Sequence, residues 1–394
     1  SASVTDTGKG FAVGPEPQAR VEGASGRPAT ESGWTNRPAL APVGRMELRF
    51  RRFDLALRHS WAIATDLKSG GGKSVYPVVF VTLTDRDGRT GIGEASPSSQ
   101  YHETHETVAA FLRRIDPDRL SFGDIEGSMA YLDALSAGDF PAKCAVNLAL
   151  IDGAARAADQ PVCNYLGLGF DDGKPVTSFT IGIDTPEVMG RKAAEAASMP
   201  ILKMKLGSPN DRENFAAVRS AAPGKWIRVD ANQAWATKEV ALGNIEWLAS
   251  DGRVEFVEQP MPASASESDA VWLKARSPLA LIGDESYQSA ADAETCAHRF
   301  HGINVKLVKT GGISAGKRAL EAARARGLKT MLGCMIESSV LITAGAHLAR
   351  LTDYLDLDGN LLITNDPYSG VRCEDGRLTF AGVGESVGLR VVPR

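Results

Sequence analysis

The sequence predicts an α/β protein in which a parallel barrel of alternating strands and helices follows a smaller α+β segment. Three observations support this prediction. The chain has 394 residues, enough for two domains or for one large barrel with an attachment. Residues 46–165 begin with alternating, strand-like runs and continue with helix-like periodicity. After Pro175, short apolar runs and amphipathic segments follow one another in a regular repeat.

Composition and charge exclude several classes of protein. The net charge is −4 at pH 7, which argues against a nucleic-acid-binding role built on a basic face. No apolar run approaches the roughly 20 residues that a membrane-spanning helix needs. The five cysteines are widely spaced, with no CxxC and no zinc-type pattern. Such cysteines are typical of free thiols in a reducing compartment, so we expect a cytoplasmic protein without nucleic-acid or membrane partners.

Residues 1–45 differ from everything that follows. They are rich in Gly, Pro, Ala, Ser and Thr, and they show no sustained periodicity. We therefore predict a flexible extension. Met46 opens the first regular pattern and is a candidate natural start, so the preceding segment is interpreted as an added or processed terminus.

The segment 46–165 is expected to form the α+β unit. Alternating patterns predict three strands, at 46–57, 75–84 and 91–94. Helical spacing then predicts three helices, at 104–115, 125–136 and 143–159. His102 and His105 are separated by three positions, one short of the zinc-peptidase spacing, so this stretch is interpreted as a helix start.

The region 166–365 is expected to be the barrel. Eight strand-like runs occur, at 178–183, 201–206, 226–229, 254–257, 279–283, 303–307, 329–334 and around Leu355. Helix-like segments lie between them, such as 186–197, 211–221 and 315–326. Eight such repeats favour a closed parallel barrel over an open doubly wound sheet, which would carry a glycine fingerprint after its first strand. The tail, 366–394, is expected to pack back on the first unit.

Charged side chains stand at the ends of successive strand-like runs. They are Lys205, Asp230, Glu258, Asp284 and Lys306, at intervals of 22 to 28 residues. These intervals equal the length of one strand-plus-helix unit. Because the strand ends of a barrel converge on one mouth, where active sites are built, we expect the five side chains to surround one site.

Three carboxylates on adjacent strands repel one another unless a cation lies among them. Aspartate and glutamate oxygens without histidine or cysteine select a hard ion, so the sequence predicts one Mg²⁺ per subunit. A lysine near this ion and near a second lysine is expected to have a lowered pKa and to act as a base. Lys205 and Lys306 on opposite sides of a bound substrate suit removal of a proton from carbon and its return from either side.

These stretches resemble the enolase superfamily, and more narrowly its muconate-lactonizing-enzyme subgroup. The resemblance lies in residues 202–205, 229–235, 257–260, 284–286 and 304–313 and extends over nearly everything from Met46 onward. It implies a modified (β/α)7β barrel of the TIM type with an α+β capping domain completed by the C-terminal tail. It also implies a set of roles: metal ligands Asp230, Glu258 and Asp284, acid/base lysines Lys205 and Lys306, and electrostatic support near the substrate carboxylate from Lys203.

Asp356 and Asp358 stand two residues apart at the last strand end, where they share one face and suit a substrate ammonium. This pair is similar to the Asp-x-Asp feature of dipeptide epimerases, which holds the free amino group of a dipeptide. The resemblance thus implies a Mg-dependent epimerase of dipeptides, with proton transfer at the α-carbon next to the carboxylate through an enediolate. The alternatives are an N-acylamino-acid racemase, an o-succinylbenzoate synthase or a cycloisomerase.

The first loop of the cap departs from the Ala-Glu type of these epimerases. Epimerases of that type resemble one another in an arginine that pairs with the substrate's side-chain carboxylate, and the loop after Trp61 has none. Lys68 or Lys73 is a candidate substitute, although a lysine lacks the bidentate fork. Thr65 and Asp66 are expected to contact the substrate, and Asp66 favours a cationic or small neutral side chain. The particular dipeptide and the oligomeric state, including a homo-oligomer, stay open.

Overall fold

The computed structural model describes residues 46–65 and 72–394, so the predicted extension and the two loop residues Asp66 and Lys68 lie outside it. The chain first forms an antiparallel sheet in the order β1-β2-β3. Its strands are β1 (Glu47–Trp61), β2 (Lys73–Thr84) and β3 (Thr90–Ala95). All three strands were predicted, and β1 continues past the expected end to Trp61.

Helices α2 (His105–Leu112), α3 (Ile125–Leu135) and α4 (Phe140–Ala157) follow the sheet, as predicted. Thr104 accepts a hydrogen bond from Thr107 N in a capping box, which confirms that the two nearby histidines mark a helix start. Helix α4 is buried along most of its length because it packs against β3 on one side and against barrel helices on the other. None of the described helices has the length and apolar character that crossing a membrane requires.

Eight parallel strands form the second sheet, and they lie side by side in chain order. They are β4 (Phe179–Ile181), β5 (Ile201–Lys205), β6 (Trp226–Asp230), β7 (Val254–Glu258), β8 (Ala280–Gly283), β9 (Gly302–Lys306), β10 (Lys329–Gly333) and β11 (Tyr354–Asp356). A parallel bridge between Thr177 and Leu355 joins the two edges. The prediction of a closed parallel barrel is therefore confirmed.

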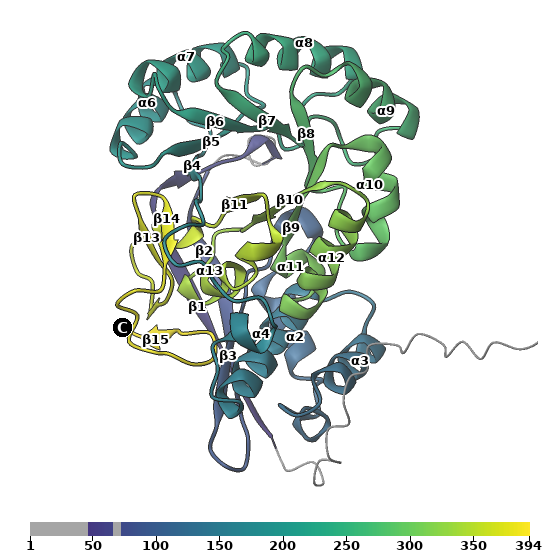
Figure 1. Ribbon diagram of the computed structural model, residues 1–394, viewed down its shortest axis with the longest axis vertical. Helices are drawn as coiled ribbons and strands as arrows, with labels where there is room; N and C mark the ends of the chain where they lie inside the picture. The colour runs from purple at the N-terminus through teal and green to yellow at the C-terminus, as the bar shows by residue number, and fades with distance from the viewer. Residues whose placement is uncertain (1–45, 66–71) are drawn as a thin grey trace, which may run out of the picture. The chain divides into compact units, whose positions relative to one another are not determined.

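Helices connect these strands and cover their outer side (Figure 1). They are α6 (Pro186–Glu195), α7 (Asp211–Ala221), α8 (Lys238–Ala249), α9 (Glu267–Arg276), α10 (Ala293–Arg299), α11 (Leu307–Thr310), α12 (Ile313–Ala325) and α13 (Ser339–Ala346). A short helix, α5 (Val162–Tyr165), precedes the first strand β4. After β11 the chain forms only a short 3₁₀ turn, η5 (Gly359–Leu361), so the last strand lacks a following α-helix.

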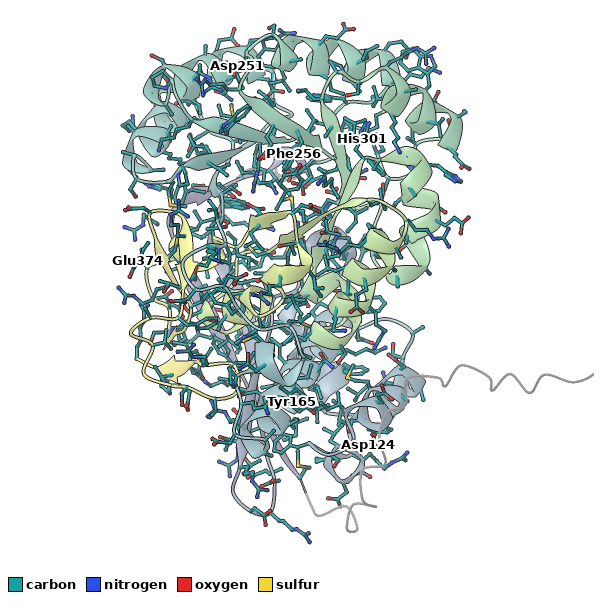
Figure 2. The ribbon with its side chains drawn as sticks, viewed as in Figure 1. Asp124, Tyr165, Asp251, Phe256, His301 and Glu374 are labelled. Carbon is teal, nitrogen blue, oxygen red and sulfur yellow. The ribbon has the colours of Figure 1, made fainter. Side chains whose placement is uncertain are left out.

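The barrel interior below the strand ends combines an apolar cluster with Arg228, which is buried and lies 5.4 Å from the centre of the Phe256 ring. Phe256, labelled in Figure 2, packs there with Ile282 and Met331. Glu258 follows Phe256 by two positions and faces the same way, because side chains alternate along a strand. The charged strand ends therefore lie directly above this packed layer, and the site is built at the C-terminal end of the barrel.

The tail contains β12 (Tyr368–Ser369), β13 (Arg372–Glu374), β14 (Arg377–Thr379) and β15 (Val392–Pro393). Before β12, Asn365 accepts a hydrogen bond from Ala56 N at 2.7 Å and donates one to Asp54 O at 2.9 Å. Further on, Thr177 N donates to Gly376 O at 2.8 Å. The tail thus contacts the first sheet and the barrel, while the domain boundaries at residues 165 and 365 stay a prediction.

Candidate active site

A cavity of about 310 Å³ lies at the C-terminal ends of the barrel strands. The barrel contributes Lys205, Lys306, Asp356 and Asp358 to its lining, among others. The first sheet and the turn after it contribute Trp61, Lys73, Tyr76 and Gln100. Both proposed acid/base lysines and the aspartate pair therefore line one space that both parts of the fold enclose.

The three predicted metal ligands converge beside this cavity. Asp230 ends β6, Glu258 ends β7, and Asp284 directly follows β8. Asp230 and Glu258 are paired in the strand register, so their side chains lie at one level. All three carboxyl groups are buried, and one oxygen of each lies within 4.8 Å of the others.

Each carboxylate of the triad accepts, at one of its oxygens, a hydrogen bond from a different residue outside the triad. Asn232 N donates to Asp230 Oδ1 at 2.9 Å, Asn304 Nδ2 to Glu258 Oε1 at 2.8 Å, and Lys309 Nζ to Asp284 Oδ1 at 2.5 Å. The other oxygen of each carboxylate contacts the ammonium groups of the barrel mouth. This arrangement orients three oxygens toward one region, which is what a metal site requires.

Lys205 and Lys306 lie on opposite sides of the barrel. Lys205 is on β5 and Lys306 on β9, four strands apart in a closed sheet of eight. Lys205 Nζ lies 2.6 Å from Asp230 Oδ2, and Lys306 Nζ lies 2.9 Å from Asp284 Oδ2. The two ammonium groups therefore approach the triad from facing walls, as the sequence predicted.

Lys203 is fully buried behind Lys205 on the same strand. Its Nζ lies 2.7 Å from Glu258 Oε2 and 2.7 Å from Asp356 Oδ2. Burial and Asp230 raise the pKa of Glu258 to about 7, while Lys203 lowers it. Lys203 thus supplies a fixed positive charge that links the triad to the aspartate pair.

The pKa of Lys306 in the metal-free protein depends on its burial and on its charged neighbours. Burial is the largest single effect and lowers the pKa of Lys306, but the combined attraction of Asp284, Tyr101 and Glu258 exceeds it, and the net pKa is well above the usual value. The pKa of Asp284 is held below its usual range, since the attraction of Lys306 and Lys309 exceeds the effect of burial. The lowering expected for a lysine beside a bound divalent cation and a second lysine stays a prediction.

The aspartate pair lies at the end of β11, where both residues line the cavity. Ser178 Oγ donates to Asp356 Oδ1 at 2.7 Å, and the other oxygen of Asp356 accepts from Lys203. Asp358 accepts a hydrogen bond from Thr180 N at 2.5 Å. Burial and the neighbouring Asp356 raise the pKa of Asp358 to about 7. Asp358 is thus the member of the pair without a cation contacting it among the described residues.

The first cap loop is only partly described. Thr65 lines the cavity as expected, and Asp66 and Lys68 fall outside the described residues. Lys73, the second candidate to replace the arginine, also lines the cavity, and its Nζ donates to Ser99 Oγ at 3.4 Å. Lys73 is therefore placed where it can contact a ligand.

Several residues that shape the site have no role predicted from the sequence. They are Gln100, Gln259, Glu285, Asn304 and Lys309. Asn304 was detectable, because it stands two positions before Lys306 on one strand and must share its face. Gln100 was not, since it lies in η1 (Ser99–Tyr101), a 3₁₀ turn without periodicity, and reaches Glu285 across 185 positions of sequence.

The barrel mouth holds a carboxylate triad, with lysines on two facing walls, and a separate sheet-and-helix unit lies beside it. This combination is typical of a class of metal-assisted acid–base enzymes. Comparison with known families agrees with this class. Residues 61–167 match the model of the mandelate racemase/muconate lactonizing enzyme N-terminal domain, and residues 188–380 match the enolase C-terminal domain-like model.

Individual relatives agree as well. The chain is 54% identical to the L-Ala-D/L-amino acid epimerase of Pedosphaera parvula, over 88% of this chain and 99% of the relative. It is 38% identical to the L-Ala-D/L-Glu epimerase of Bacteroides thetaiotaomicron, over 86% of each chain. Among solved structures, the dipeptide epimerase of Enterococcus faecalis V583 in complex with Mg and L-Leu-L-Tyr superimposes with a TM-score of 0.78 at 30% identity, covering 89% of this chain and 99% of that one.

The chain therefore belongs to the mandelate racemase/muconate lactonizing enzyme family of the enolase superfamily. The superfamily and the subgroup predicted from the sequence are confirmed, and the chain is an enzyme of the epimerase type found in this family.

Proposed function

We propose that the protein is a Mg²⁺-dependent dipeptide epimerase that inverts the α-carbon next to the free carboxylate. The observation that carries this proposal is the placement of Lys205 and Lys306 on facing walls, each against one carboxylate of the same triad. Two bases on opposite sides of one carbon are what inversion at that carbon needs.

The donor set of the triad fits a hard divalent cation. Its ligand atoms are carboxylate oxygens alone, which Mg²⁺ prefers, and outer donors already orient them. When bound, the ion would supply positive charge to the substrate carboxylate and so stabilise the enediolate formed when the α-proton leaves. Asp230, Glu258 and Asp284 are the proposed ligands.

The lysines carry the proton transfer in this proposal. One of Lys205 and Lys306 takes the α-proton, and the other delivers a proton to the opposite face. Lys306 contacts Asp284 Oδ2, an oxygen that is also a proposed metal ligand. A lysine released from this contact loses the attraction that raises its pKa and becomes able to accept a proton. Buried Lys203 adds positive charge close to the substrate carboxylate.

Asp356 and Asp358 are proposed to bind the free amino group of the substrate. Both carboxylates line the cavity, and Asp358 has no contacting cation among the described residues. An ammonium group would therefore find a buried carboxylate ready to pair with it. The names of the relatives support dipeptides that begin with L-alanine as the first substrates to test.

The test is α-proton exchange. A panel of L-Ala-L-Xaa dipeptides and their N-acetyl counterparts is incubated with enzyme and Mg²⁺ in deuterated water and followed by NMR. We expect loss of the α-proton at the second residue and formation of its epimer, with N-acetyl compounds at least tenfold slower. Absence of exchange across the panel contradicts the proposal, and faster turnover of the N-acetyl compounds favours the racemase alternative.

Lysine variants test the mechanism in the same assay. Lys205→Met and Lys306→Met each remove one base and should lower the epimerisation rate by roughly 10²–10⁴-fold. Lys174→Met is the control, because Lys174 is an exposed residue that forms only a long 3.9 Å ion pair with Asp171. If either site variant epimerises as fast as the control, two-base catalysis is wrong.

A further inference from the structure

A fourth carboxylate lies beside the triad and has no role in the mechanism above. Glu285 directly follows Asp284 and is 5% exposed. Its Oε1 accepts hydrogen bonds from Gln100 Nε2 at 2.9 Å and Asn232 Nδ2 at 3.4 Å. The three side chains come from η1 of the cap, the loop after β6 and the loop after β8. The cluster therefore connects the cap to two of the loops that carry metal ligands.

Two acceptors of this cluster have no donor within the described part of the chain. Glu285 Oε2 and Asn232 Oδ1 are buried, and neither has a hydrogen-bond partner among the residues that the structure describes. Within the same residues, Glu285 forms no ion pair either. A buried acceptor without a donor destabilises the folded protein, and a charged one does so more strongly. Both atoms can therefore accept hydrogen bonds from a species that binds at the site.

We propose that Gln100, Asn232 and Glu285 form an outer layer of the metal centre and bind the hydrated divalent cation through a coordinated water. This inference rests on the metal site of the proposed function. A water molecule on a divalent cation has two strong donors, because the ion polarises it, and the cluster offers two buried acceptors that lack a partner. Asn232 already belongs to the centre, since its backbone N–H fixes Asp230 Oδ1.

Gln100 connects this outer layer to the wall of the substrate cavity. Its side chain is a cap donor to Glu285, and Ser98, Ser99 and Gln100 together line the substrate cavity. A cation that orders Glu285 therefore also orders the η1 turn and one wall of the cavity. Gln100 and Glu285 are positioning residues, because they act through the metal centre and not on the reacting atoms.

Calorimetric titration with Mg²⁺, without substrate, tests this inference. Glu285→Gln should weaken Mg²⁺ binding by roughly 10–100-fold, the usual effect of removing an outer partner, and Gln100→Leu should weaken it by several-fold. Two exposed residues give matched controls, Glu239→Gln on α8 and Gln160→Leu beyond α4. Both controls should stay within twofold of the parent protein.

Hydrogen exchange gives an independent readout of the cap. In the parent, Mg²⁺ should slow amide exchange in residues 98–102, and this protection should be lost in Glu285→Gln and Gln100→Leu. Glu285→Gln should not lower the melting temperature of the metal-free protein, since it removes a buried unpaired charge. A residue with a merely structural role would lower it.

The outcomes separate this inference from the proposed function. The outer layer is wrong, while the metal site stands, under either of two outcomes. In the first, both variants bind Mg²⁺ within twofold of the parent. In the second, Mg²⁺ protects residues 98–102 of the variants from exchange as strongly as it does in the parent. A parent protein that does not bind Mg²⁺ overturns the metal site and the outer layer together.

Discussion

The ionisation of Asp358 is expected to make substrate binding depend on pH. Burial and Asp356 raise its pKa to about 7, so the carboxyl group is ionised above that pH and protonated below it. A protonated Asp358 cannot pair with an ammonium ion. We therefore predict that kcat/KM for a dipeptide falls up to tenfold per pH unit below about pH 7. The measurement is kcat/KM between pH 5.5 and 9.

The control for this prediction is Asp358→Asn, which removes the ionisation and keeps the shape. Its kcat/KM should be lower than that of the parent at pH 8, and the ratio of the two should shrink as the pH falls. An N-acetyl substrate, which has no ammonium group, should give a constant ratio. A parent-to-variant ratio that does not change with pH for the dipeptide contradicts this role of Asp358.

At the residue scale, the sequence was informative wherever spacing encodes position. Asp230, Glu258 and Lys306 were predicted to meet because strand ends converge, and they do. Contacts between elements that are far apart in the sequence cannot be predicted from residue spacing. Glu285 stood inside a recognised motif, but its role depends on Gln100, whose place follows from how the cap packs on the barrel. The pKa of Lys306 likewise depends on its burial and on contacts such as that with Asp284, which the spacing of residues in the sequence cannot give.

At the element scale, the close packing of β3 on α4 positions the cap. A Cβ added at Gly93 would lie 1.9 Å from Ala145 O, in the backbone of α4. Backbone atoms in a buried helix cannot move aside, so we predict that Gly93→Ala lowers the free energy of unfolding by about 3 kcal/mol, the upper part of the range for overpacking. Urea unfolding followed by circular dichroism measures this change.

Gly243→Ala provides the matched control. Gly243 is exposed within α8, and an added Cβ there meets nothing within 4 Å. The same substitution should therefore raise stability by about 0.5–1 kcal/mol, because alanine loses less backbone entropy in a helix. Equal effects of the two substitutions would show that α4 and β3 are not packed as closely as described.

The existence of the elements was predictable, and their ends less so. Helix α4 was expected to start at Lys143, but it begins at Phe140, because Pro141 occupies a first-turn position where a missing N–H costs nothing. Strand β1 continues to Trp61 through exposed polar residues, where the alternation that revealed its first half fades. The strands of the barrel were easier to predict from the sequence, since burial on both faces gives continuous apolar runs.

At the scale of the whole molecule, cap, barrel and tail share their stabilising contacts. Helix α4 packs between β3 and the barrel helices α11 and α12. The tail residue Leu389 is fully buried, its N–H donates to Asp152 Oδ1 of α4 at 2.7 Å, and its carbonyl lies 3.0 Å from His347 Nε2 at the end of α13. The sequence predicted that the tail packs on the cap, and it did not reveal these joint contacts, which depend on tertiary packing.

Because these contacts are shared, we predict that cap and barrel unfold in a single transition and that Leu389→Ala shifts this transition as a whole. Loss of a buried leucine costs about 2–5 kcal/mol, which for a chain of this size corresponds to a fall in melting temperature of several degrees. Differential scanning calorimetry is the measurement, with the ratio of calorimetric to van't Hoff enthalpy as the test of cooperativity.

Glu374→Ala is the control, since Glu374 is exposed on β13 in the same tail (Figure 2) and should leave the transition in place. Two separate peaks, or a shift of only part of the heat absorption in Leu389→Ala, would mean that cap and barrel are stabilised independently and that the tail belongs to only one of them.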